Sequence, residues 1–87
     1  MVKIIEGFPE KWLAVIGDKE VPLREYCKEA RLKAGMSMDK LNRRSGLGHP
    51  TVNNYESGKY QSLPAMVTAL LTLGHEIEIK PPGARGG

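Results

Sequence analysis

Apolar residues recur every three or four positions over most of the chain and every second position near its end, which predicts four helices followed by one strand. The first helix is predicted to begin at Leu23 and to end at Gly35, because glycine favours the left-handed backbone that often follows a helix. Its apolar positions fall at steps of three, four, seven and eleven, so they share one face. That inward face consists of Leu23, Tyr26, Cys27, Ala30 and Ala34.

Two shorter helices are predicted next, with a tight turn between them. Ser37 can cap a helix over residues 37–44, and the glycines of residues 45–48 end it. Proline is tolerated only in the first turn of a helix. Pro50 therefore places the start of the following helix at residue 49 or 50, and that helix is predicted to end at residue 55 or 56.

A fourth helix is predicted from residue 63 or 64 to residue 73, where Gly74 ends it. After Gly74, polar and apolar residues alternate strictly over residues 76–80, as in a strand. A lone strand cannot satisfy its backbone, so this one pairs either with residues 2–6 or with its copy in a second subunit. The inward positions of the fourth helix are Leu63, Met66, Val67, Leu70 and Leu71.

The first 22 residues fit two descriptions. The apolar residues at positions 2, 4 and 5 favour a short strand, whereas Pro9 and the spacing of Trp12, Leu13 and Ile16 favour a short helix. The end of the chain is rich in glycine and proline and is predicted to be disordered. The chain therefore divides into an N-terminal extension (1–22), a helical domain (23–74), a C-terminal strand (75–80) and a tail (81–87).

Composition limits the class of protein. A chain of 87 residues with 40% hydrophobic content fits one compact domain with a small core. A single cysteine, Cys27, cannot form an internal disulfide, which argues against a secreted scaffold and for a reducing cytoplasm. The longest nearly apolar stretch, residues 65–73, is far shorter than the roughly 20 residues that span a bilayer. With no signal peptide evident, we expect a soluble cytoplasmic protein without a membrane partner.

The net charge of +3 is concentrated in the middle of the chain. Residues 31–60 carry six basic and two acidic residues, or +4, whereas residues 1–30 carry −1 and the remainder is neutral. A basic middle suits a protein that meets a polyanion, because neutralising phosphates releases counterions. The alternative is a solvated helical face, which charge alone does not exclude.

Specific motifs extend this pattern. They are Ala34-Gly35-Met36-Ser37, Leu41, Ser45-Gly46-Leu47, Val52 and Tyr55-Glu56-Ser57-Gly58-Lys59. Together they resemble the helix-turn-helix of the lambda repressor and Cro family, the xenobiotic-response-element (XRE) type, over about residues 23–74. The resemblance implies a mainly α fold, namely a lambda-repressor-like helix-turn-helix bundle with a short terminal β element. It also implies that the protein is associated with the nucleoid.

The resemblance also implies which residues meet double-stranded DNA. His49, Pro50 and Asn54 would lie on the face of the recognition helix that enters the major groove, with Thr51 and Asn53 beside them. An asparagine amide can read adenine, although Asn54 could instead be a solvated helix residue and His49 a helix cap. Lys40, Arg43, Arg44, Ser57 and Lys59 are candidates for phosphate contacts.

Three further features follow from the resemblance. Similar repressors join an Arg and a Glu at the positions of Arg31 and Glu56, so we expect a structural brace there that also orients Arg31 toward a phosphate. Met38 stands where the family commonly has a glutamine, and methionine cannot make that polar DNA contact. Asn42 stands where the family favours a small residue, and it could tilt the helix crossing or bond across it.

The C-terminal strand resembles that of HipB-type antitoxins, which pairs across a dimer axis. Ile77 and Ile79 would then lie in a dimer strand, and a toxin protein becomes a possible partner. Our main hypothesis is a repressor that binds a palindromic operator as a homodimer. One alternative is an antitoxin with autoregulatory DNA binding, and another is a protein-interaction adaptor without DNA binding.

Catalytic motifs are incomplete. His75-Glu76 begins a His-Glu-x-x-His zinc motif, but Ile79 stands where the second histidine is needed. Cys27 lies on the apolar face of its helix, which is typical of a packed core residue rather than a nucleophile. We therefore expect no enzyme activity, no metal and no cofactor.

Overall fold

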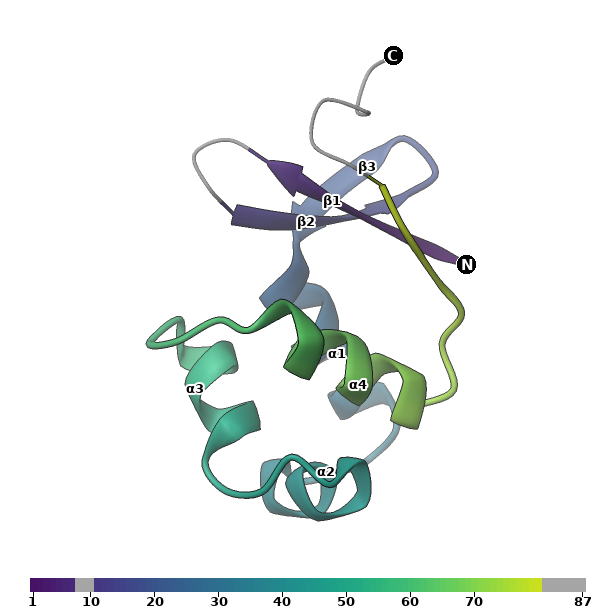
Figure 1. Cartoon of the computed structure of the whole chain (residues 1–87). Coiled ribbons are helices and arrows are strands. Elements are labelled where there is room, and N and C mark those ends of the chain that lie inside the picture. Colours follow the sequence, from purple (N-terminus) through teal and green to yellow (C-terminus); the bar gives the residue numbers. More distant parts are fainter. Residues whose placement is uncertain (8–10, 81–87) are drawn as a thin grey trace.

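Three strands come before the helices and a fourth comes after them (Figure 1). The computed structural model describes residues 1–7 and 11–80, and the predicted tail, residues 81–87, lies outside this part. The elements in chain order are β1 (Val2–Gly7), β2 (Lys11–Ile16), β3 (Lys19–Pro22), α1 (Leu23–Lys33), α2 (Met38–Ser45), α3 (Thr51–Ser57), α4 (Leu63–Thr72) and β4 (Ile77–Ile79).

In its described residues the N-terminal extension is a three-stranded antiparallel sheet, so the short helix considered from the spacing of Trp12, Leu13 and Ile16 is wrong. Pro9, which also favoured that helix, lies outside the described residues. β2 pairs with β1 on one side and with β3 on the other, and Ile16 and Lys19 face each other across a two-residue turn. Gly17 takes a positive φ of 62° in this turn, a conformation that glycine adopts without steric cost. Strand pairing, rather than the local spacing of Trp12 and Ile16, therefore decides the structure here.

β4 adds to the other edge of the sheet. It runs parallel to β1, which gives the strand order β3-β2-β1-β4. The N–H of Val2 donates to the carbonyl of Glu76 at 2.9 Å, and the N–H of Lys80 donates to that of Ile4 at 2.8 Å. Of the two pairings open to this strand, the one with the N-terminal segment is therefore present within the chain. The fold is four helices with a four-stranded sheet, not the mainly α bundle that we expected.

The four helices lie where the sequence predicts them, with small shifts. The third helix begins at Thr51, one or two residues later than the predicted start at residue 49 or 50, and Pro50 is its N-cap. Two positions predicted to face inward are exposed: Ala34, which follows the last residue of α1, and Leu71, which is 57% exposed on α4. The buried face of α4 is centred instead on Ala65, Met66, Ala69 and Leu70.

One core joins the sheet to the helices. Val2 and Ile4 of β1 and Ala14 of β2 belong to the same apolar cluster as Cys27 of α1 and Leu70 of α4. Figure 1 shows the sheet at one end of the molecule, with α2 at the opposite end and α3 beside it. The sheet thus covers the end of the bundle that is away from α2, and the surface of α2 and α3 stays open.

Cys27 is a core residue, as its place on the apolar face predicts. It is fully buried, and burial raises the pKa of its thiol to about 12. A thiol that stays protonated at neutral pH is a poor nucleophile.

Among the described helices, none has the length and apolar character needed to cross a membrane.

Candidate nucleic-acid interface

α2, a tight turn and α3 form the centre of the candidate interface. The Ser37 hydroxyl accepts a hydrogen bond from the N–H of Lys40 at 3.1 Å and so caps α2. Gly46 ends α2 with a positive φ of 75°, where a side chain would be strained. The chain then reverses within five residues and enters α3 at Thr51. Local residue chemistry at both ends of α2 therefore sets the angle at which α3 begins.

Apolar side chains hold the two helices together. Leu41 of α2 and Val52 of α3 are fully buried, Tyr55 of α3 is 1% exposed, and Leu47 of the turn packs against the same core. All four belong to the motifs that carry the resemblance to the lambda repressor and Cro family. The hydroxyl of Tyr55 is buried without a hydrogen-bond partner among the described residues.

Asn42 links α2 to α3 through hydrogen bonds. It is 1% exposed, its amide nitrogen donates to Oδ1 of Asn53 at 3.0 Å, and its amide oxygen accepts from the N–H of Val52 at 2.9 Å. The N-cap of α3, Pro50, has no side-chain capping bond of its own. Asn42 therefore supplies from α2 the acceptor that the first turn of α3 lacks. Of the two effects considered from sequence, bonding across the crossing is the one observed.

The ion pair expected between Arg31 and Glu56 is present and nearly buried. Nε of Arg31 lies 2.6 Å from one carboxylate oxygen, and Nη2 lies 2.9 Å from the other, so the pair is bidentate. The side chains are 9% and 6% exposed. The hydrogen bonds that Arg31 donates to the Glu56 carboxylate raise the pKa of Arg31, against the opposing effect of burial. This geometry joins α1 to the C-terminal end of α3.

Arg31 is directed inward rather than toward a phosphate. Its remaining terminal nitrogen, Nη1, donates to the carbonyl of Met36 at 2.8 Å. Three nitrogens of the guanidinium thus have protein partners, and the residue is 8% exposed. The expectation that Arg31 is also oriented toward DNA is wrong for this reason, whereas its bracing contact is present.

A second arginine on α1, Arg24, also contacts the end of α3, and the sequence analysis did not single it out. Its Nη1 donates to the carbonyl of Glu56 at 3.2 Å. Its guanidinium lies so close to Gly58 that an added Cβ would meet it at 3.4 Å. Arg24 and Arg31 are seven residues apart, a spacing that places them on one helix face, and that spacing could have identified the pair.

The side-chain amide of Asn54 on α3 has no hydrogen-bond partner among the described residues. The residue is partly exposed. Its backbone carbonyl, by contrast, accepts from the N–H groups of Lys59 and Tyr60 and from the hydroxyl of Ser57. The backbone is therefore fixed while the amide is free to meet a ligand.

Three other predicted DNA contacts are already hydrogen-bonded within the protein. Thr51 donates to the carbonyl of Leu47 at 3.2 Å, and Asn53 accepts from Asn42 as described. Ser57 donates to the carbonyl of Asn54 at 3.1 Å and accepts from the N–H of Lys59 at 3.3 Å. These side chains shape the helix and the turn after it.

His49 and Pro50 are exposed at the start of α3. Nδ1 of His49 lies 3.7 Å from a carboxylate oxygen of Asp39, and both side chains are about 70% exposed. Contacts between exposed charged groups at this distance contribute little. The start of the helix is therefore accessible and weakly tethered to α2.

Four basic side chains surround α3 without internal partners. They are exposed, and none forms an ion pair or hydrogen bond through its side chain within residues 1–7 and 11–80. The four basic residues are Lys40, Arg43 and Arg44 of α2 and Lys59 after α3.

Met38 stands where the family commonly has a residue that makes a polar DNA contact. Its side chain is half-buried and packs against the core.

The structure is that of a helix-turn-helix protein: α2 and α3 cross and are joined by a tight turn. α3 is held by contacts with α1 and α2 and is open to solvent on its other face. A family model described as helix-turn-helix matches residues 28–73, more than half of the chain. The chain belongs to this helix-turn-helix family, of the XRE type, and is a DNA-binding transcription regulator. The match leaves out all four strands. No match was found among curated proteins or among solved structures.

Proposed function

We propose that this protein is a repressor that reads a palindromic operator through α3. The observation that carries the proposal is the free amide of Asn54 on a helix fixed from behind by Arg31, Glu56 and Asn42. An amide in this position can bond an adenine edge in the major groove. A helix that is held rigid loses little entropy when it docks.

The unpaired cations support the same proposal. Lys40, Arg43, Arg44 and Lys59 come from both sides of the turn, so they can contact the backbone that flanks the groove. His49 and Pro50 at the open start of α3 lie nearest to where base edges would enter. Thr51, Asn53 and Ser57 are positioning residues in this scheme, because their side chains are used within the protein.

A homodimer would match a palindromic operator, with half-sites about 34 Å apart. The support for a dimer is the open edge of β4. The carbonyl of Glu76 and the N–H of Lys80 point toward β1 and are hydrogen-bonded to it. Because backbone groups point to opposite sides at successive residues of a strand, the N–H and carbonyl groups of Ile77 and Ile79 point away from β1. Antiparallel addition of a second β4 at this edge would join two sheets into one.

The same edge supports a second candidate function. A toxin could add a strand to β4 instead of a second copy, as the antitoxin hypothesis requires. The two functions share the DNA-binding face and differ only in what occupies the edge. The family match ends at residue 73, so the resemblance of β4 to the strand of HipB-type antitoxins stays a prediction.

The deciding experiment is selection from a random double-stranded DNA library with the full chain at about 0.15 M salt. Enrichment of an inverted repeat, with an affinity that falls steeply as salt rises, is the expected result. A single enriched half-site would retain base reading but remove the dimer. No enrichment by a folded protein would leave the adaptor without DNA binding as the better hypothesis.

A further inference from the structure

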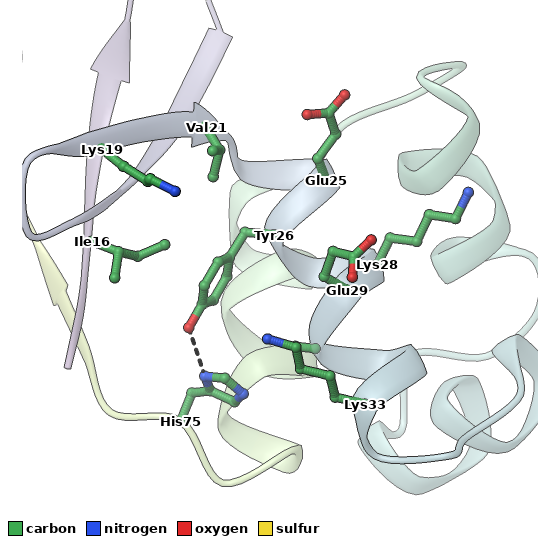
Figure 2. A pocket seen from close by; sticks show the side chains of 10 residues that line it. Ile16, Lys19, Val21, Glu25, Tyr26, Lys28, Glu29, Lys33 and His75 are labelled. Carbon is green, nitrogen blue, oxygen red and sulfur yellow. Dashed lines mark hydrogen bonds between the residues drawn. The ribbon is translucent and has the colours of Figure 1, made fainter.

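A cavity of about 640 Å³ lies between the sheet and α1 (Figure 2). Its walls come from the end of β2, from β3, from α1 and from the linker between α4 and β4. The volume falls within the range that is typical of small-molecule sites. None of its lining residues takes part in the candidate DNA interface.

One wall of the cavity is apolar. Ile16 is 43% exposed there, although it is a large hydrophobic residue, and Val21 and the ring of Tyr26 continue the same surface. An apolar surface of this kind favours a ligand with a hydrophobic or aromatic body. It contributes no charge selectivity by itself.

The deep end of the cavity holds an ordered polar pair. The hydroxyl of Tyr26 lies 3.0 Å from Nδ1 of His75, and the two rings meet edge to face at 5.5 Å. The phenol donates to Nδ1 in the tautomer that carries the imidazole hydrogen on Nε2. Nε2 has no partner among the described residues, so in this tautomer His75 offers one free donor.

Two lysines line the cavity from opposite walls. Figure 2 shows the ammonium group of Lys33, from α1, extending toward the Tyr26–His75 pair, whereas that of Lys19, from the hairpin, lies beside Val21. Neither forms an ion pair with any described carboxylate. Glu25 and Glu29 also line the cavity, but their carboxylates point away from the Tyr26–His75 pair in the same view. The polar end is therefore positive.

We propose that this cavity is a binding site for a small aromatic carboxylate. The ring of the ligand packs on Ile16, Val21 and Tyr26. Its carboxylate is held by the ammonium group of Lys33 and by Nε2–H of His75 at the end of the cavity that holds the Tyr26–His75 pair. This inference does not depend on DNA binding, because the cavity and the α3 surface share no residue.

Salicylate and its neutral amide, salicylamide, are the probes that test this site. Each is titrated into the ¹⁵N-labelled full chain and followed by the backbone amide resonances. The expected result is a saturable shift with salicylate at residues 19, 21, 26, 33 and 75, and little shift with salicylamide. A lack of saturation with salicylate, or equal binding of both probes, would overturn the proposal.

The variants separate charge recognition from nonspecific association. The variant Lys33→Gln should weaken salicylate binding about tenfold, because a charge-assisted contact is lost. Lys33 is exposed, so an unchanged spectrum away from the cavity verifies the fold. Lys40→Gln, which makes the same change outside the cavity, should leave the affinity for salicylate unchanged. Equal affinity of Lys33→Gln and the parent protein would contradict the site.

Discussion

Asn42 of α2 donates a hydrogen bond to Asn53 of α3, and the same amide of Asn42 accepts from the backbone of Val52. A single buried side chain thus fixes both the crossing of the two helices and the first turn of the second one. The family favours a small residue at this position, which makes no such bonds. In this protein the orientation of α3 depends on a polar contact as well as on packing.

Asn42→Ala is expected to lower the free energy of unfolding by about 1–3 kcal/mol, because the N–H of Val52 loses its acceptor inside the protein. Denaturant titration with circular dichroism measures this change. Asn53→Ala is the matched control, since it removes only the side chain-to-side chain bond and leaves Val52 capped. Its cost should be smaller, about 1 kcal/mol. Equal costs would mean that the cap contributes nothing.

The burial of Cys27 gives stability a defined pH dependence. Its thiol has an ordinary pKa of 9.0 in the unfolded chain and about 12 in the fold. Below pH 9 both states are protonated and the contribution is complete. Above pH 9 the unfolded state loses the proton that the fold retains, so the free energy of unfolding falls by up to about 1.4 kcal/mol per pH unit.

Cys27→Ala isolates this effect. Burial also raises the pKa values of Tyr26 and Tyr55, and this contribution is common to the variant and the parent protein, so it cancels when their stabilities are compared over pH 9 to 10. The variant is less stable overall because it leaves a cavity. Its stability should nevertheless decline less over this interval than that of the parent protein. Identical slopes would show that the thiol does not contribute.

Tyr55→Phe is expected to stabilise the protein. The hydroxyl of Tyr55 is buried without a partner among the described residues, and such a group costs about 1–3 kcal/mol. Removal of the oxygen should raise the midpoint of thermal unfolding by about 4 °C or more. Tyr60→Phe serves as the control because Tyr60 is 66% exposed and should show no change. A lower midpoint for Tyr55→Phe would reveal a bound water that bonds the hydroxyl.

Asn54→Ala is expected to cost about 1–3 kcal/mol on the selected operator and little on random DNA, because a base contact carries sequence information. Fluorescence anisotropy with both DNAs measures the difference. Lys59→Gln is the contrasting variant: it should weaken binding to both DNAs and reduce the salt slope by about one. An equal loss on both DNAs for Asn54→Ala would exclude base reading by this residue.

Ile79→Pro tests the dimer at the open edge of β4. Its N–H points away from β1, so proline removes a donor from the proposed interface and leaves the pairing within the chain intact. Ile79 is 52% exposed, which limits the loss of packing. Sedimentation velocity should show monomers. Glu78→Pro removes an N–H that faces β1 and should instead destabilise the fold. If Ile79→Pro still forms a dimer, the dimer interface does not include the edge of β4.

The helices were predictable because their boundaries depend on local chemistry. Ser37 caps α2, and Gly46 and Gly58 take positive φ values of 75° and 81° after α2 and α3. The pairing of Arg31 with Glu56 was predictable only through the family resemblance, because nothing in the spacing of two distant residues implies contact. The inward role of Asn42 was foreseen as one of two alternatives, and the structure selects it.

The strands were harder to predict because their stability comes from residues far away in the chain. Residues 12–16 are apolar at every position, so no period distinguishes strand from helix there. The Gly17-Asp18 pair that follows is a hairpin signal, and it agrees with the strands rather than with a helix over residues 12–16. The cavity between Ile16, Tyr26 and His75 could not be foreseen, since it depends on how the sheet is placed over α1.

The pairing of β1 with β4 makes the order of synthesis important. Ribosomes produce β1 first and β4 last, so the edge of β1 that receives β4 stays open until the last strand has been made. The exposed edge of β1 would accept β4 from a neighbouring nascent chain as readily as its own. Strand exchange between chains is therefore the misfolding route that this topology favours at high expression.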